Sequence, residues 1–194
     1  MRFFIGLLVT FFVSSSYLIN EKKEIKIDAG IYEVLYSESL EQPKDVWYTV
    51  KCRDGKASRK GMDFYTNDSI HTSSSEDYED NIWDKGHMAP AADFSCDKET
   101  LYKTFSYLNC SLQHQDLNRG VWRLLEAEER KLSKIQEVRV HIVLSFNEGS
   151  KKLYTGATVP DGFRKEIYYS NKVDIYYFKN KKPTSRDFKK FKIN

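Results

Sequence analysis

The sequence lacks several patterns that would assign a function directly. Its nine glycines are scattered singly over 194 residues, so no glycine-rich phosphate loop is present. No segment repeats along the chain, which excludes a repeat protein. Charge of one sign does not dominate either, since 31 Lys and Arg stand against 28 Asp and Glu. The net charge of +3 permits a polyanionic partner without demonstrating one.

Cysteine is also scarce. The three cysteines are Cys52, Cys96 and Cys110. An oxidising compartment would permit one disulfide and leave one thiol over, and the sequence does not choose the pair. Three buried, small apolar side chains are an equally good interpretation. No cysteine lies near the end of the N-terminal apolar run, so we do not expect a lipid-anchored lipoprotein.

A long hydrophobic run occurs at the N-terminus, where an arginine precedes Phe3–Val13 and three serines follow. The run is shorter than the ~20 apolar residues of a membrane-spanning helix. A positive start, an apolar centre and a small-residue end are typical of a secretory signal peptide. We therefore predict a signal peptide over residues 1–16, a solvated lead-in over 17–30 and one domain over 31–194. The mature protein is expected to be secreted or periplasmic without stable membrane association; an uncleaved anchor is the alternative.

What the sequence does contain is enough for a β-rich core. Apolar residues make up 40% of the chain, and 13 Tyr and 12 Phe favour strands over a helical bundle. Alternating, β-rich segments predict strands at residues 31–37, 46–52, 108–112, 138–146, 166–170 and 173–179. Helices are predicted from the Asp97 cap to about Ser106 and over Leu117–Leu132. These elements predict a single α+β domain with a mainly antiparallel central sheet flanked by helices.

One set of polar side chains in the middle of the chain points to chemistry. His87 lies in the stretch WDKGHMAP, where on its own it would be an ordinary loop histidine. Asn118 lies near the start of the second predicted helix, and on its own it would be a helix-start residue. Glu126 and Arg130 follow four residues apart on that helix, and could be a surface ion pair.

Together these side chains suit phosphodiester hydrolysis. A neutral imidazole can accept a proton from water near pH 7, and His87 would supply this imidazole. Mg²⁺ prefers oxygen ligands and keeps most of its waters, so the amide oxygen of Asn118 would suffice, with Glu126 holding the waters. Arginine and lysine side chains nearby would hold the anionic phosphate.

Two blocks of the sequence resemble a known family. DKGHMAP, residues 84–90, resembles the D-R-G-H-x-A-P motif of the DNA/RNA non-specific endonucleases, the ββα-metal (His-Me finger) nucleases that include mitochondrial endonuclease G. DLNRGVWRLLEAEERKL, residues 116–132, resembles the family's L-N-x-x-x-W-x-x-L-E helix with its following arginine. The resemblance implies a ββα-metal fold and an Mg²⁺-dependent endonuclease that cuts DNA and RNA through contacts with backbone phosphates. Mn²⁺ would suit the same oxygen ligands.

The resemblance also implies catalytic and metal-binding roles. His87 would be the general base that activates water. Asn118 would be the sole direct protein ligand of Mg²⁺, and Glu126 would act through metal-bound water. Asn109 would position His87 or the phosphate, and Asp84 would orient the motif and the hydrated metal.

Further positions would contact the substrate if the resemblance holds. Arg130 would contact the scissile phosphate or the product, and Lys85 and Gln113 would join it in binding substrate. The family has an arginine upstream of the motif that stabilises the transition state. Arg59 is the first candidate for that position and Arg53 the second.

The chain departs from the family pattern at two positions. Lys85 replaces the motif arginine, and Leu112 replaces the proline that usually precedes Gln113. Lysine keeps the charge but loses the two-pronged phosphate geometry, so we expect weaker positioning of the phosphate. The alternative function is therefore a nucleic-acid-binding protein with attenuated or lost catalysis. The tail Lys179–Asn194, with seven Lys and Arg and one Asp, is either a solvated end or a nucleic-acid clamp.

Overall fold

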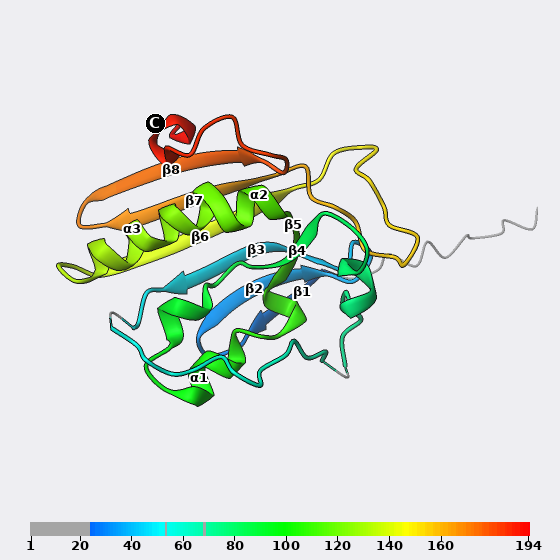
Figure 1. Ribbon diagram of the computed structural model, residues 1–194, viewed down its shortest axis with the longest axis horizontal. Helices are drawn as coiled ribbons and strands as arrows, with labels where there is room; N and C mark the ends of the chain where they lie inside the picture. Colours follow the sequence, from blue (N-terminus) through cyan, green and yellow to red (C-terminus); the bar gives the residue numbers. More distant parts are fainter. Residues whose placement is uncertain (1–23, 53, 68) are drawn as a thin grey trace, which may run out of the picture.

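The computed structural model describes residues 24–52, 54–67 and 69–194 (Figure 1). The strands are β1 (Glu24–Asp28), β2 (Tyr32–Ser37), β3 (Gln42–Thr49), β4 (Trp83–His87), β5 (Cys110–His114), β6 (Val138–Ser145), β7 (Gly162–Tyr169) and β8 (Lys172–Lys179). The α-helices are α1 (Lys98–Lys103), α2 (Gln115–Leu117) and α3 (Arg123–Ser133). A π-helical segment, η4 (Asn118–Trp122), joins α2 to α3, and short 3-10 turns are η1 (Ser75–Tyr78), η2 (Ala91–Phe94), η3 (Tyr107–Asn109) and η5 (Phe188–Phe191).

Six strands form one antiparallel sheet in the order β1-β2-β3-β6-β7-β8, and β4 pairs with β5 in a separate two-stranded sheet. The predicted α+β class and the mainly antiparallel sheet are confirmed. In β6, alternate residues from Val138 to Leu144 are buried and those between them are partly or fully exposed, as the period of two requires. Trp122 is fully buried and its ring packs against those of Phe163 and Phe178, which joins the helical layer to β7 and β8.

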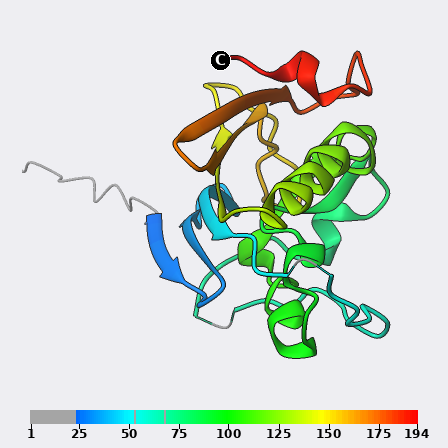
Figure 2. The same ribbon diagram turned by 90° about the vertical axis from the view of Figure 1, so that its left-hand side faces the viewer.

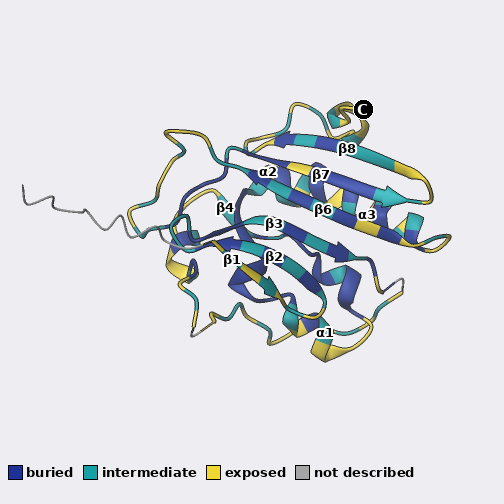
Figure 3. Cartoon of the chain, turned by 180° about the vertical axis from the view of Figure 1, so that it is seen from behind, coloured by how far each residue is buried: buried dark blue, intermediate teal, exposed yellow. Residues whose placement is uncertain are grey.

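The helices cover one face of the large sheet, as Figures 1 and 2 show. Within the part of the chain that the structure describes, no helix covers the opposite face, which Figure 3 presents to the viewer. There Trp47 and His141 stack with ring centroids 3.9 Å apart, and the guanidinium of Arg139 lies 4.5 Å from the Trp47 ring. None of the helices in the described ranges is both long and apolar enough to cross a membrane.

The predicted solvated lead-in is wrong from Glu24 onward, because residues 24–28 form β1. This strand pairs with β2 from Glu24 opposite Ser37 to Asp28 opposite Glu33. Its residues are exposed or partly buried, as expected of an edge strand. The charged side chains that suggested a solvated segment are the ones that protect such an edge from pairing with other chains. The predicted signal peptide, residues 1–16, lies outside the described residues.

Strand β3 begins earlier than predicted, at Gln42 instead of Val46, and includes Pro43. Proline has no N–H to donate to a ladder and is tolerated at bulges. The β2–β3 register shifts between Leu35 and Tyr36, where Tyr36 comes opposite Pro43. The bulge therefore admits a residue that the pattern excluded from the strand.

The helix after Asp97 is confirmed, but it ends at Lys103, before the predicted end at about Ser106. The Asp97 side chain caps it by accepting a hydrogen bond from the Thr100 N–H at 2.8 Å. The single helix predicted over Leu117–Leu132 is wrong, because the backbone leaves α-helical geometry at Gly120, with φ −100° and ψ −116°. π-Helical segments inside helices occur frequently at functional sites. This one begins at Asn118, the proposed metal ligand.

The structure also resolves the cysteine pairing, with a disulfide between Cys52 and Cys96 and a buried free thiol at Cys110. Backbone hydrogen bonds reinforce this link, from the Cys52 N–H to the Asp93 carbonyl and from the Ala57 N–H to the Ser95 carbonyl, both at 2.9 Å. The segment after Cys52 is therefore held against η2 and the start of α1.

Candidate active site

The motif, where alternation predicted no strand, forms strand β4, and its partner β5 leads directly into α2. Asp84 lies opposite Gln113, and His87 lies opposite Cys110. Since side chains alternate across a strand, Asp84 projects from one face of the hairpin while Lys85 and His87 project from the other. The hairpin therefore carries two groups of functional side chains.

His87 lies in an aromatic pocket. Its ring centroid is 4.9 Å from that of Phe64 and 5.0 Å from that of Phe105. Its Nε2 atom is buried and has no hydrogen-bond partner among the residues described. Burial, helped by the positive charge of Arg59, lowers the pKa of His87 to about 3. The imidazole is therefore neutral at pH 7, as a general base must be.

Arg59 lies near His87, and its role in stabilising the transition state stays a prediction. Its side chain is exposed, and its charge is felt by the imidazole. The Cys52–Cys96 disulfide anchors the segment that carries it. Arg53, the second candidate, lies outside the described residues.

Asn109 fixes the chain that follows His87. Its Oδ1 accepts from the Ala89 N–H at 2.7 Å, and its Nδ2 donates to the carbonyls of Ala89 and Thr104 at 2.9 and 3.0 Å. The backbone carbonyl of Asn109 accepts from the Met88 N–H at 2.9 Å. Asn109 has no exposed surface, so the geometry favours positioning of His87 over contact with a phosphate.

A second group gathers around Asp84. The Asn118 Nδ2 atom donates to Asp84 Oδ2 at 2.9 Å. Arg119 donates to the same carboxylate twice, from Nε to Oδ2 at 2.9 Å and from Nη2 to Oδ1 at 2.6 Å. Because Asp84 engages the amide nitrogen of Asn118, Oδ1 of Asn118 is turned away from it and left for another partner. Arg119 was missed in the sequence, where a charged residue at a helix start gave no signal of its own.

Glu126 and Arg130 lie in a charged cluster below α3. Arg130 Nη1 donates to Asp93 Oδ1 at 2.7 Å, and the Asp93 side chain is fully buried. Burial raises the pKa of Glu126 to about 7, with the nearby charges of Lys165 and Arg130 opposing the rise and that of Glu129 adding to it. The Arg130 side chain is partly exposed, and its contact with the phosphate stays a prediction.

Two charged residues in this cluster were missed entirely in the sequence. Glu129 and Lys165 have no exposed side-chain surface, and Lys165 Nζ lies 2.7 Å from Glu129 Oε1, although the angles do not fit a hydrogen bond. Tyr48 donates its hydroxyl to Glu129 Oε2 at 2.7 Å, and Lys165 Nζ lies 4.3 Å from the centroid of the Trp122 ring. The sequence signal for Lys165 was its place between Phe163 and Ile167, which alternate with it on the buried face of β7.

Lys85, which replaces the motif arginine, is held near His87 by aromatic contacts. Its Nζ lies 5.5 Å from the ring centroids of both Phe64 and Tyr107, and 3.6 Å from Asp63 Oδ1. Desolvation alone would lower the pKa of Lys85, but the hydrogen bond to Tyr107 and the charge of Asp63 raise it. Lys85 therefore remains a cation with part of its surface exposed.

Gln113 does not lie where a substrate contact would need it. Its side chain is fully buried, which corrects the prediction that it binds substrate. It packs under Gly86, where an added Cβ atom would lie 2.5 Å from Gln113 Oε1 and 2.6 Å from Gln113 Cβ. The buried Gln113 side chain therefore leaves no room for a Cβ atom at Gly86, the residue before His87.

Replacing Gly86 with alanine is expected to lower the free energy of unfolding by ~1–3 kcal/mol, the usual range for overpacking. Since His87 is the next residue, cleavage should fall as well. Urea unfolding followed by circular dichroism measures the first effect. The double variant Gly86→Ala/Gln113→Ala removes the clash with Oε1 and should recover part of the stability. An unchanged unfolding midpoint for Gly86→Ala would contradict this packing.

The donor set fits a hard divalent cation. No cluster of three or more His, Cys, Asp or Glu suited to a metal occurs in the described ranges 24–52, 54–67 and 69–194. What the site offers is the amide oxygen of Asn118, oriented by Asp84, with the carboxylate of Glu126 further along the helix. Mg²⁺ tolerates so few protein ligands because it keeps several waters, whereas structural zinc needs four.

Comparison with known proteins finds nucleases among the relatives of this chain. The sequence is 35% identical to mitochondrial nuclease EXOG of Danio rerio over 82 residues, which covers 41% of this chain and 24% of that protein. It is 31% identical to human mitochondrial endonuclease G over 83 residues, covering 41% of this chain and 28% of that protein. It is 28% identical to a nuclease of Serratia marcescens over 127 residues, covering 57% and 45%. The chain thus aligns with about a quarter of the length of the first two relatives.

The fold has a close counterpart as well. A crystal structure of the EndoG/EndoGI complex matches 90% of this chain and 82% of the compared chain with a TM-score of 0.78 and 22% sequence identity, which demonstrates the shared fold. The sequence profile described as DNA/RNA non-specific endonuclease matches residues 13–194. The chain therefore belongs to the DNA/RNA non-specific endonuclease family.

Proposed function

We propose that this protein is an Mg²⁺-dependent endonuclease that hydrolyses phosphodiester bonds of DNA and RNA with little sequence preference. The observation that carries the proposal is the hairpin β4–β5. Within four residues it carries a neutral imidazole, His87, and the Asp84 carboxylate that orients Asn118. Family membership supports the same activity.

In this proposal His87 is the general base. Its Nε2 is buried, so Nδ1 is the nitrogen that accepts a proton from water. The water oxygen bonds to phosphorus as the bond from phosphorus to the 3′ oxygen breaks, and the leaving 3′ oxygen takes a proton from solvent water. The products are a 5′-phosphate and a 3′-hydroxyl, the polarity that the family resemblance implies. Asn118 would hold the cation directly and Glu126 would hold its waters. When bound, the cation supplies positive charge that stabilises the charge developing on the phosphate and the leaving oxygen.

Three cationic side chains would position the phosphate. Lys85 and Arg59 lie on the His87 side of the hairpin, and Arg130 extends from α3. Lys85 supplies one point charge where an arginine would supply two parallel donors. The chemistry is retained in this proposal, with looser orientation of the phosphate.

We also propose that the enzyme acts outside the cytoplasm, as a secreted or periplasmic protein. The Cys52–Cys96 disulfide supports this location, because such bonds persist in oxidising compartments. The predicted signal peptide is consistent with it.

A plasmid assay tests the activity. Supercoiled plasmid with the purified protein in Mg²⁺ should be nicked, linearised and then degraded, and structured RNA should be degraded in parallel. EDTA should stop both reactions, and Mn²⁺ should restore them. Cleavage should also slow as salt rises, because contacts to backbone phosphates weaken with salt. Retention of DNA without cleavage in Mg²⁺ would overturn the proposal in favour of a nucleic-acid-binding protein with lost catalysis.

A further inference from the structure

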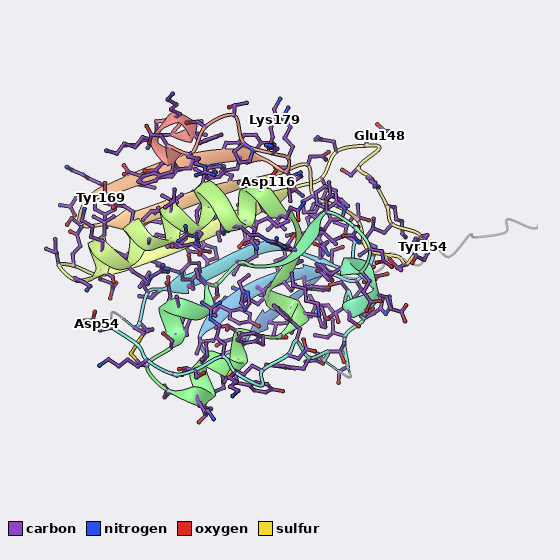
Figure 4. The ribbon with its side chains drawn as sticks, viewed as in Figure 1. Asp54, Asp116, Glu148, Tyr154, Tyr169 and Lys179 are labelled. Carbon is purple, nitrogen blue, oxygen red and sulfur yellow. A yellow bond between two sulfur atoms is a disulfide. The ribbon has the colours of Figure 1, made fainter. Side chains whose placement is uncertain are left out.

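A basic hollow of about 520 Å³ lies beside the candidate active site. One wall is the α2–η4–α3 segment and the other is the C-terminal tail. The lining side chains that matter here are Asp116, Arg119, Arg123, Leu124, Lys182 and Arg186. We call this hollow the basic groove. Figures 1 and 2 show the tail passing over the start of the helical segment, and Figure 4 labels Asp116 and Lys179 on that side of the molecule.

Positive charge exceeds negative charge in the basic groove. Four of its lining residues are Arg or Lys and one is Asp. Lys182 Nζ lies 3.9 Å from Asp116 Oδ2, so the Asp116 carboxylate offsets the charge of Lys182 through a long ion pair. Arg123 donates Nε to the Arg119 carbonyl at 3.2 Å, and neither Arg123 nor Arg186 has a carboxylate partner in the described part of the chain. Two exposed guanidinium groups are therefore available to an anion.

The basic groove is continuous with the proposed metal site. Asp84 Oδ2 accepts hydrogen bonds from both Asn118 Nδ2 and Arg119 Nε. One carboxylate thus orients the proposed metal ligand and the first cation of the groove. An anion in the groove would lie on the Asp84 and Asn118 side of the hairpin, next to α2.

We propose that the basic groove binds a backbone phosphate of the nucleic-acid strand adjacent to the phosphate that is cut. The proposal rests on the nuclease function proposed above. Guanidinium groups match phosphate with paired donors, which suits Arg123 and Arg186. Leu124, an exposed apolar residue on the same wall, faces the space that the neighbouring sugar would fill. The tail is then part of the substrate site.

The test compares two double variants that remove the same charge. Arg123→Ala/Arg186→Ala removes the two free guanidinium groups of the groove. Lys189→Ala/Lys190→Ala is the control, because both lysines are exposed on the same tail and neither lines the groove. Each pair is placed in a His87→Ala background so that the nucleic-acid probe is not cleaved during the binding measurement. Thermal melting checks that both variants fold.

Binding of a fluorescent single-stranded oligonucleotide is measured by anisotropy in Mg²⁺ over a salt series. The groove variant should bind about tenfold or more weakly, because it loses two charge-assisted contacts to a phosphate. The slope of log binding constant against log salt concentration should be smaller in magnitude by ~1–2 for the groove variant, and should change less for the control. Equal losses in the two variants would overturn the proposal, because the tail would then act only through its overall charge.

Cleavage by the same pairs with His87 restored separates this proposal from the nuclease function. If the wild type cleaves and the groove variant matches the control in KM and salt dependence, the groove proposal fails and the nuclease stands. If the wild type binds without cleaving and the groove variant alone loses affinity, the groove stands and catalysis fails. If the wild type does not bind the oligonucleotide, both proposals fail.

Discussion

Replacing His87 with alanine is expected to lower kcat/KM for plasmid cleavage by about 10²–10⁴-fold, the usual contribution of a positioned general base. The loss should fall on kcat, because His87 acts on water and makes no ion pair with the substrate in the proposed mechanism. His71→Ala is the control, since His71 is an exposed histidine paired with Glu41. A His87→Ala enzyme that digests plasmid at the wild-type rate would exclude His87 as the base.

The buried imidazole adds a second readout to the same variant. The folded-state pKa of His87 is lowered from 6.5 to about 3, so between these values the folded protein binds fewer protons than the unfolded chain. The stability that the neutral imidazole contributes is therefore full above pH 6.5 and is lost as pH falls toward 3. His87→Ala should flatten this acid limb of the unfolding free energy. An acid limb identical to that of wild type would show that His87 is not buried as a neutral group.

Replacing Lys165 with methionine is expected to lower the free energy of unfolding by ~3–5 kcal/mol, the range for breaking a buried ion pair by removing one partner. Glu129 would be left in the core with only the Tyr48 hydroxyl as a donor. Urea unfolding measures the loss. Lys26→Met is the matched control: its lysine pairs with Glu33 at 3.4 Å on the exposed β1 edge and should change stability little.

A double variant tests whether the loss comes from the stranded charge. Lys165→Met/Glu129→Leu removes both charges and should recover most of the stability, because apolar replacements of a buried ion pair are often neutral or stabilising. If the double variant is as unstable as Lys165→Met, the packing of the lysine stem on Trp122 matters more than its charge. If Lys165→Met alone is as stable as wild type, the ion pair does not form as described.

Elements set by local sequence could be predicted, whereas elements that depend on pairing with distant segments could not. Strands β2, β3, β6, β7 and β8 follow from alternation, and the cap at Asp97 follows from a single hydrogen bond within one turn. These patterns are local, so the sequence shows them. The edge strand β1 was missed because its stability comes from pairing with β2, and its charged residues resemble those of a solvated segment. Strand β4 was missed for the same reason, since its pairing with β5 replaces local propensity.

The sequence by itself determined the family, because its two motif blocks combine chemically specific residue types at fixed spacing. It also selected His87, Asn118 and Arg59, whose predicted roles await test. Only the tertiary structure decided the cysteine pair, the break in the helix at Gly120 and the buried Glu129–Lys165 pair. The disulfide and the ion pair depend on residues far apart in the chain meeting in a buried environment, and no local pattern marks the break at Gly120. Neither composition nor periodicity encodes that distance, so no reading of the chain alone could supply it.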